Sequence, residues 1–263
     1  MLRVVRSELT RLAQRRTLLV WFGLMALFAL MVNTVMGAAV GQLDPNMPSP
    51  GVSFPTPAEL EAPSGLMAGL SAASNMFGVV TLSMWAFFTA QDYSSGLIRL
   101  LVAGEPRRWR LLAGKSIALV GVTAVAVTVA ALANIVAAPA VAASGISTAA
   151  WGTDLPTVIG EAWVNLFLSQ LVWGVLGLVI AVLSRSAMVA VSIGVGYVLV
   201  VESLIRMVDG APVDQLLGTT LGAIAKGGTT AVSYSSALAL GAAYVIVGLV
   251  LAGIVFTRRD VTD

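Results

Sequence analysis

The sequence predicts an all-α membrane protein with six transmembrane helices and both termini in the cytoplasm. Apolar residues make up 58% of the 263-residue chain and charged residues only 11%. The mean hydropathy of +0.93 lies far above that of an ordinary water-soluble domain. The apolar residues gather in runs close to the roughly 20 residues that a helix needs to cross a bilayer.

Six runs are long and apolar enough to be spans, and together they form one domain. We predict transmembrane helices over residues 17–40, 66–90, 116–141, 157–183, 187–208 and 235–256. Only Ser184, Arg185 and Ser186 separate the fourth and fifth runs, which therefore form a tight helical hairpin.

The positions of the cations predict the orientation. Thirteen of the 15 lysines and arginines lie in the N-terminus, the 91–115 connection, the turn at Arg185 and the C-terminal tail. Positive residues are retained on the cytoplasmic side of a membrane, so these segments are predicted to face the cytoplasm. Arg206 and Lys226 are the two exceptions.

The first 16 residues are too polar to span but have a helical pattern. Their apolar residues fall on one side of a helical wheel and most of their charges on the other: Leu2, Val5, Leu9, Leu12 and Ala13 against Arg3, Arg6, Glu8, Arg11 and Arg15. Such a helix lies in the membrane interface. Alternatively, the segment is a positive flank that only sets the topology.

The external connections differ from each other. Residues 41–65 contain six prolines and no cation, which predicts an extended surface segment. Residues 209–234 carry an apolar stripe in a segment too polar to span, broken by Gly227 and Gly228. We predict short re-entrant helices that dip into the outer leaflet before the sixth span.

Several classes of chemistry are excluded by composition. The chain has no cysteine and no histidine, which removes disulfides, thiol chemistry, histidine-based zinc sites and serine-histidine catalysis. It has no phosphate-binding loop of the form GxxxxGK[ST] and no paired intramembrane carboxylates. A net charge of +2 does not favour nucleic-acid binding. We therefore expect no catalytic residue, metal or cofactor in this chain.

Few polar or aromatic residues at membrane depth are candidates for a transport pathway. Glu202 and Arg206 stand four residues apart on the fifth run, where they would form a structural ion pair or contact a substrate. Asn75 and Phe77 on the second run and Tyr197 on the fifth would line a cavity for an amphipathic substrate. The plainer interpretation is helix-to-helix hydrogen bonding and an aromatic belt.

The connection between the second and third spans carries the most information. Residues 91–115, QDYSSGLIRLLVAGEPRRWRLLAGK, hold five cations against Asp92 and Glu105, and their apolar residues recur at helical spacing. Gly104 and Pro106 divide the segment, because glycine ends a helix easily and proline suits the first turn of the next. We predict a cytoplasmic helix, a corner and a second helix that enters the third span.

This connection resembles the first cytoplasmic loop of permease subunits of type-2 ABC transporters, a family of exporters. In that family an acidic residue, Gly, a hydrophobic pair, Arg and Leu-Leu precede a Pro with basic residues and a final Gly-Lys. The matching residues here are Asp92, Ser95, Gly96, Leu97, Ile98, Arg99, Leu100, Leu101, Pro106, Arg107, Arg108, Gly114 and Lys115. Glu is common in the family where this chain has Asp92. The tail from Phe256 to Val261 and the N-terminal elbow helix (1–16) are similar too.

The resemblance implies a mechanism. Two permease subunits, as a homodimer or a related heterodimer, would form the path in a bacterial plasma membrane. Each would dock a separate ABC ATP-binding subunit, which carries ATP and Mg, through a cytoplasmic coupling helix. The implied coupling interface comprises Asp92, Gly96, Arg99, Glu105, Pro106, Arg107 and Arg108. For the basic residues, the alternative is topology and attraction to anionic membrane lipid.

The expected substrate is hydrophobic or amphipathic, such as a drug, an antibiotic peptide or a lipid-like compound. A competing hypothesis is an ATP-independent secondary carrier or channel, which would need its own ion site near the bilayer midplane. An intramembrane enzyme is disfavoured by the missing histidines and carboxylate pairs.

Overall fold

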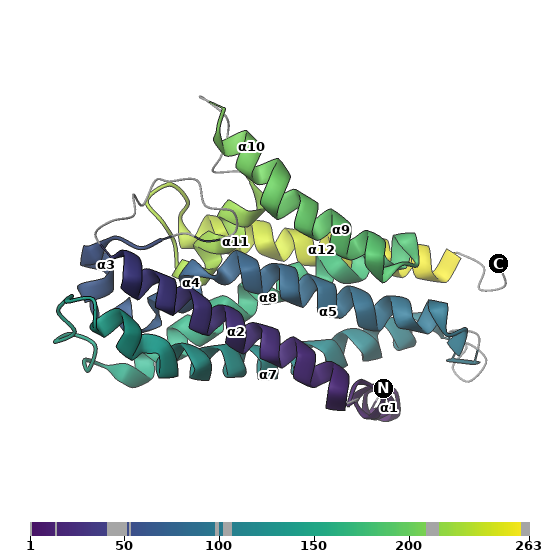
Figure 1. Cartoon of the computed structure of the whole chain (residues 1–263). Coiled ribbons are helices and arrows are strands. Elements are labelled where there is room, and N and C mark those ends of the chain that lie inside the picture. Colours follow the sequence, from purple (N-terminus) through teal and green to yellow (C-terminus); the bar gives the residue numbers. More distant parts are fainter. Residues whose placement is uncertain are drawn as a thin grey trace.

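The computed structural model describes residues 2–13, 15–40, 52, 54–97, 100–101, 107–208 and 216–258, and every regular element among them is a helix. Within these described ranges, four helices are long and apolar enough to cross a membrane: α2 (Arg15–Ala39), α7 (Arg108–Ala142), α8 (Leu155–Ser184) and α12 (Tyr234–Arg258). They run lengthwise through one elongated bundle (Figure 1). The predicted all-α membrane class is thereby confirmed.

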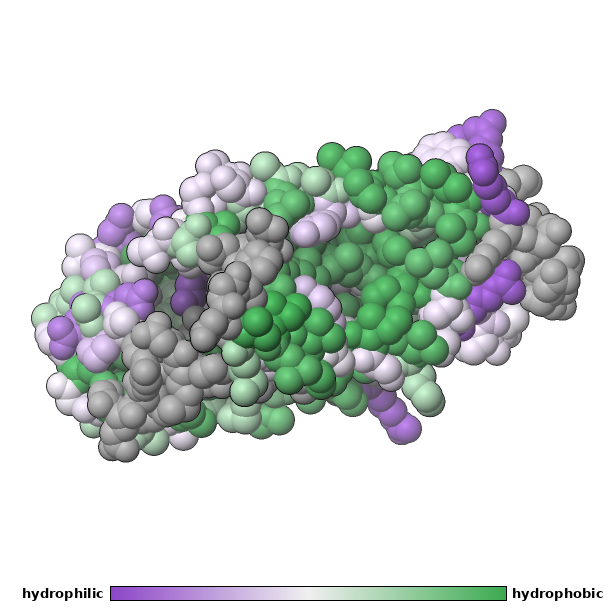
Figure 2. Space-filling model, turned by 90° about the horizontal axis from the view of Figure 1, so that it is seen from above, coloured by the Kyte–Doolittle hydropathy of each residue, from purple (hydrophilic) through white to green (hydrophobic). Residues whose placement is uncertain are grey.

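The outer surface of the bundle is apolar over its middle. Large hydrophobic side chains point outward from several of the long helices, such as Leu19, Leu132, Val136 and Ile246. Figure 2 shows hydrophobic residues over the middle of one face, while hydrophilic residues gather toward the two ends. A surface of this kind is suited to lipid rather than water.

The second predicted span is bent. A 3-10 turn, η1 (Pro63–Met67), and the short helix α4 (Ala68–Ala72) join α5 (Ser74–Ser94) at an angle of 46°. The break lies at Ala73, whose backbone leaves the helical region with φ −88° and ψ 3°. Hydropathy predicted residues 66–90 as one helix because it does not detect such a break.

The fifth predicted span, 187–208, consists of three consecutive helical pieces. They are α9 (Ala187–Gly196), a π-helical turn η2 (Tyr197–Val201) and α10 (Glu202–Arg206). A helix of this total length spans about 30 Å. In Figure 1, α9 lies along the bundle and α10 leans away from it.

The third predicted span begins earlier than expected. The helix α7 starts at Arg108, rather than near Ser116, and runs for 35 residues. A helix this long exceeds a bilayer. The cationic turns between Arg108 and Lys115 therefore run directly into the third predicted span, as predicted for the second helix of the 91–115 connection.

The two ends of the bundle differ. Helix α1 (Leu2–Leu12) lies at the end that also holds the C-terminal ends of α5 and α12 and the start of α7 (Figure 1). Figure 1 looks almost along the axis of α1, so this helix runs crosswise to the bundle, as an interfacial helix does. The opposite end holds α3 (Pro57–Glu61), α4 and α11 (Leu217–Lys226).

The proline-rich connection is less extended than predicted. Both α3 and η1 begin at a proline, which suits the first helical position because its missing N–H would be unpaired there anyway. Leu60 and Met67 are buried, and the Trp151 indole N–H donates to the Leu60 carbonyl over 2.7 Å. Residues 41–51 and 53 lie outside the described residues.

Candidate functional site

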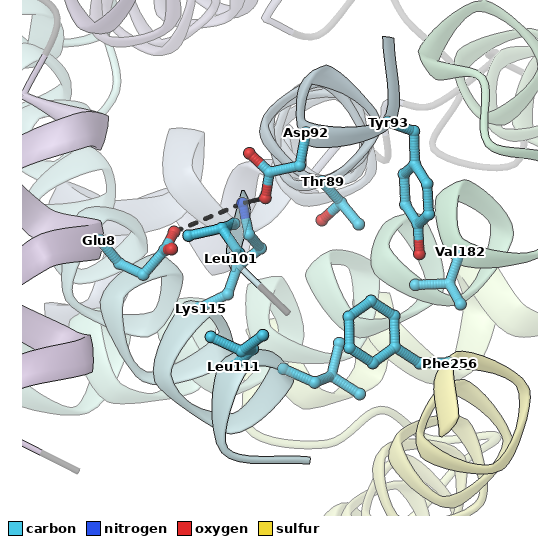
Figure 3. A pocket seen from close by; sticks show the side chains of 10 residues that line it. Glu8, Thr89, Asp92, Tyr93, Leu101, Leu111, Lys115, Val182 and Phe256 are labelled. Carbon is cyan, nitrogen blue, oxygen red and sulfur yellow. Dashed lines mark ion pairs between the residues drawn. The ribbon is translucent and has the colours of Figure 1, made fainter. Parts of the chain in front are cut away.

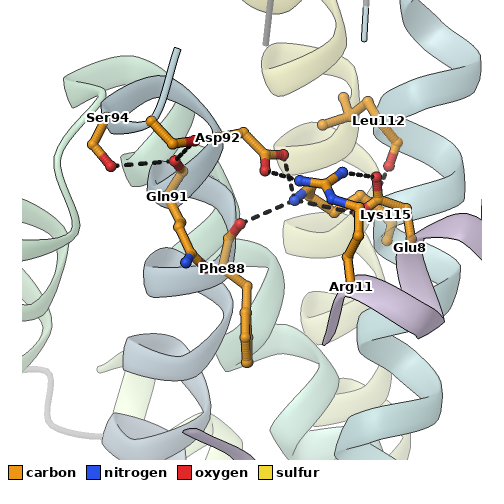
Figure 4. A network of polar contacts seen from close by, with 10 residues as sticks. Glu8, Arg11, Phe88, Gln91, Asp92, Ser94, Leu112 and Lys115 are labelled. Atoms are coloured by element: carbon orange, nitrogen blue, oxygen red, sulfur yellow. Dashed lines mark hydrogen bonds and ion pairs between the residues drawn. The ribbon is translucent and has the colours of Figure 1, made fainter. Parts of the chain in front are cut away.

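Four charged side chains from three helices meet where α1 crosses the bundle. Glu8 and Arg11 come from α1, Asp92 from the last turns of α5 and Lys115 from the early part of α7 (Figure 4). Glu8, Asp92 and Lys115 are only 3%, 4% and 7% exposed. We call these four residues the charge cluster.

The ammonium of Lys115 is saturated with acceptors. Its Nζ lies 2.5 Å from Asp92 Oδ2 and 3.4 Å from Glu8 Oε2, and it donates to the Phe88 carbonyl over 2.9 Å. The guanidinium of Arg11 donates to the other carboxylate oxygens of both Glu8 and Asp92. Two anions thus face two cations, which offsets the high cost of burying each charge.

A glycine lets α1 approach α7. A Cβ at Gly114 would lie 2.5 Å from Val4 Cγ1, closer than side-chain atoms approach. Gly114 therefore provides the close helix contact, and Lys115 beside it provides the ion pairs. Together they give a physical reason for the Gly-Lys pair at the end of the 91–115 segment.

A small cavity adjoins the charge cluster. Figure 3 shows Lys115 between the carboxylates of Glu8 and Asp92, with Phe256 and Val182 on the apolar side. The cavity has room for about one water molecule. The cluster is consequently a joint between helices and is too tight for an organic substrate.

The structure places the predicted coupling residues in different environments. Asp92 was expected to face a partner, but it is buried in the charge cluster. Gly96 lies just beyond the end of α5 and has φ +69°, a backbone conformation that glycine adopts easily. Arg107 is exposed. Arg108 starts α7, although its side chain lies outside the described residues, as do Arg99, Glu105 and Pro106.

Exposed apolar residues flank this part of the connection. Leu100 is 71% exposed and Trp109 is 53% exposed. The guanidinium carbon of Arg110 lies 5.6 Å from the centre of the Trp109 ring. We call Leu100, Arg107 and Trp109 the end surface.

The predicted pathway residues divide into two sets. Phe77 is fully buried in the apolar core, and Asn75 is half-buried. Tyr197 and Glu202 instead meet at the N-terminus of α11, where the Gly218 N–H donates to Glu202 Oε1 over 2.5 Å. The predicted pairing of Glu202 with Arg206 involves a side chain outside the described residues.

Polar side chains inside the bundle mostly join helices. Asn33 of α2 donates to Asn134 of α7 over 2.8 Å, and Thr81 of α5 donates to Gln170 of α8 over 2.8 Å. Gln170 also donates to the Ser74 carbonyl over 3.1 Å. These contacts fit the plainer sequence interpretation of helix-to-helix hydrogen bonds.

One residue of the N-terminal segment, Glu8, could have indicated the charge cluster. The helical pattern of residues 1–16 treats it only as one more polar residue. It is the single acid among these 16 residues, which hold five arginines. A carboxylate buried among apolar side chains needs a cationic partner. Arg11, three residues along α1, is one such partner. The other partner, Lys115, lies more than 100 residues away, and no local pattern reveals that contact.

The fold and the buried ion pairs define the chain as an all-helical, multi-pass membrane protein with a charged joint at one end of its bundle. Residues 23–262 match the family described as "Protein of unknown function (DUF2705)", and the chain belongs to that family. A comparison with curated proteins gives no match.

Proposed function

We propose that this protein is the membrane-spanning permease subunit of an ATP-driven ABC exporter, with six spans and both termini in the cytoplasm. The observation that carries the proposal is the charge cluster. It joins α1, α5 and α7 at the one end of the bundle where the 95–107 connection leaves α5 and enters α7. Force applied to that connection would reach three helices together.

The helices on both sides of the connection are also firmly held at the charge cluster. Asp92 stands two residues before the end of α5, and α7 runs unbroken from Arg108 through Lys115. The buried ion pairs fix the ends of both helices to each other and to α1. A soluble partner that pulls the connection would therefore move whole helices instead of deforming a loop.

The end surface is the proposed docking site for the ATP-binding subunit. It combines a cation with two exposed apolar side chains, Leu100 and Trp109, beyond the buried cluster. Aromatic and arginine residues often carry much of the energy of protein interfaces. ATP and Mg would bind to the partner, and a second permease subunit would complete the path for a hydrophobic or amphipathic substrate.

The proposal is tested by co-purification with any ABC ATP-binding protein whose coding sequence lies next to that of this chain. We expect a stable complex that Trp109→Ala with Arg107→Glu weakens by at least tenfold in affinity, because both changes fall on the end surface. Arg258→Glu, at the same end but on α12, is the matched control and should bind normally. If the natural chain, the double variant and Arg258→Glu all bind the ATP-binding protein equally well, the proposed interface is wrong.

A second experiment separates the two transport hypotheses. The purified chain alone, reconstituted in vesicles, should not accumulate a labelled amphipathic compound against a gradient, and addition of the ATP-binding subunit and ATP should permit it. Accumulation by the chain alone would favour the ATP-independent carrier and overturn the proposal.

A further inference from the structure

A π-helical turn interrupts the fifth span at one place, Tyr197–Val201. The Glu202 N–H bonds to the Tyr197 carbonyl five residues back, in place of the usual four. Such turns cost stability and are frequent at functional sites. What this turn achieves is visible in the side chains at its two ends.

The turn brings Tyr197 and Glu202 onto one face of the helix. In an α-helix, residues five apart point about 140° away from each other, because each residue turns the chain by about 100°. Because the π-turn holds one extra residue, Tyr197 and Glu202 lie on one face, as residues four apart do in an ordinary α-helix. Both side chains consequently reach the same target, the first turn of α11.

The two side chains cap α11. Its own N-cap residue, Leu216, has no side chain that accepts a hydrogen bond. The N–H of Leu217 donates to the Tyr197 hydroxyl over 3.2 Å, and the N–H of Gly218 donates to the Glu202 carboxylate. The Tyr197 hydroxyl lies close to the Glu202 carboxylate. The negative charge of the carboxylate also interacts favourably with the positive end of the dipole of α11.

Gly218 leaves the space that the carboxylate occupies. A Cβ at this position would lie 2.3 Å from Glu202 Oε2 and 2.8 Å from Oε1. Any larger residue would push the carboxylate off the helix end. The missing side chain at Gly218 thus leaves room for the carboxylate of Glu202, which is only 3% exposed.

The capped helix is deeply packed. Leu221, Ala223 and Ile224 of α11 are at most 1% exposed, and they pack with Val172 and Trp173 of α8. Figure 1 places α11 at the end of the bundle opposite α1. Helix α11 therefore fills the bundle at that end, and its N-terminus is fixed from the fifth span.

We propose that the π-turn is a latch for α11. With the π-turn formed, Tyr197 and Glu202 hold α11 in the bundle. When the turn reverts to α-helix, Glu202 rotates by about 100° and both caps are lost in one step. The latch does not depend on the proposed function. In an exporter it would close the path at the end opposite the charge cluster.

The absence of cysteine from the chain permits a direct test in detergent. Ala223→Cys places one thiol on the buried face of α11, and its rate of reaction with a water-soluble maleimide reports release. We expect slow labelling in this background. Gly218→Ala or Glu202→Ala should accelerate it by about 5- to 30-fold, the range expected for the loss of a helix cap.

Two controls separate release of α11 from general unfolding. Ser203→Ala, next to Glu202 on the same helix, should leave the labelling rate unchanged. In a separate chain, Ala130→Cys places the single thiol at a fully buried position of α7. This thiol should stay protected when each substitution at Gly218, Glu202 or Ser203 is added. Labelling of Ala223→Cys that does not respond to Gly218→Ala or Glu202→Ala would overturn the latch.

Deletion of Val200 tests the π-turn itself. Val200 is 54% exposed, so its removal costs little core packing while it shortens the turn to α-helical length. The deletion leaves Tyr197 and Glu202 four residues apart on one face of an uninterrupted α-helix, so both caps are kept while the turn can no longer revert. We expect the labelling of Ala223→Cys to stay at least as slow as in the undeleted chain. Labelling as fast as with Glu202→Ala would show that the π-turn does not hold α11 through this pair.

Discussion

At the scale of the residue, Lys115 is the most sensitive member of the charge cluster. Lys115→Met leaves two buried carboxylates facing Arg11 alone, because Nζ serves both Asp92 and Glu8. Breaking a buried charge set in this way costs about 3–5 kcal/mol. We expect a matching fall in the free energy of unfolding, measured by thermal or denaturant unfolding in detergent.

The double variant Lys115→Met with Asp92→Asn is the matched control. It removes one charge of each sign and leaves Glu8 paired with Arg11, which are held together within α1. The double variant should therefore be more stable than Lys115→Met alone. If the single variant is the more stable of the two, the ion pairs do not determine the stability of this joint.

Lys226 at the end of α11 gives a prediction about pH. Burial lowers the pKa of its ammonium below the ordinary 10.5, and the Glu59 carboxylate opposes this only in part. Between the lowered pKa and 10.5, the unfolded chain binds more protons at Lys226 than the folded chain does. The stability contributed at this site therefore rises with pH in that alkaline window.

Lys226→Met removes this proton linkage. Thermal unfolding of the natural chain and the variant, compared from about pH 8 to about pH 11, should give a stability difference that favours the variant most at the lower pH. A difference that is independent of pH would show that the pKa of Lys226 is not lowered by folding.

At the scale of the element, two glycines of α7 make a matched pair. A Cβ at Gly114 would meet Val4 of α1 at 2.5 Å, whereas a Cβ at Gly121 would meet nothing within 4 Å. Gly114→Ala should lose about 1–3 kcal/mol through overpacking and loosen α1. Gly121→Ala should be neutral or stabilising, since alanine suits a helix better.

Hydrogen exchange of the α1 amides checks this contact, because loosening of α1 raises its exchange rate while the core of α7 stays protected. Faster exchange in Gly121→Ala than in Gly114→Ala would mean that the contact with Val4 does not seat α1.

The sequence predicted elements better than it predicted their contacts. The long helices α2, α8 and α12 lie close to the predicted 17–40, 157–183 and 235–256, because the thickness of the bilayer sets the length of an apolar run. The bend at Ala73 and the π-turn were missed, since both depend on packing against distant helices. Asp92 was expected at a partner surface for the same reason: its two cationic partners belong to other helices.

At the scale of the whole molecule, the orientation in the membrane is the prediction on which the proposed coupling depends. The structure places Arg107 and Ala149 at exposed positions, Arg107 at the start of α7 and Ala149 beyond the end of α7. The distribution of cations predicts that the first faces the cytoplasm and the second faces outside. The cysteine-free chain allows each to be replaced by a single labelled thiol.

Intact cells are treated with a maleimide that does not cross membranes. Ala149→Cys should react at once, while Arg107→Cys should react only after the membrane is permeabilised, because a long apolar helix separates them. The opposite pattern would place the end surface outside the cell, where no ATP-binding subunit could reach it. Such a result would end the proposed coupling, yet the latch at α11 would stand, since its test requires no membrane.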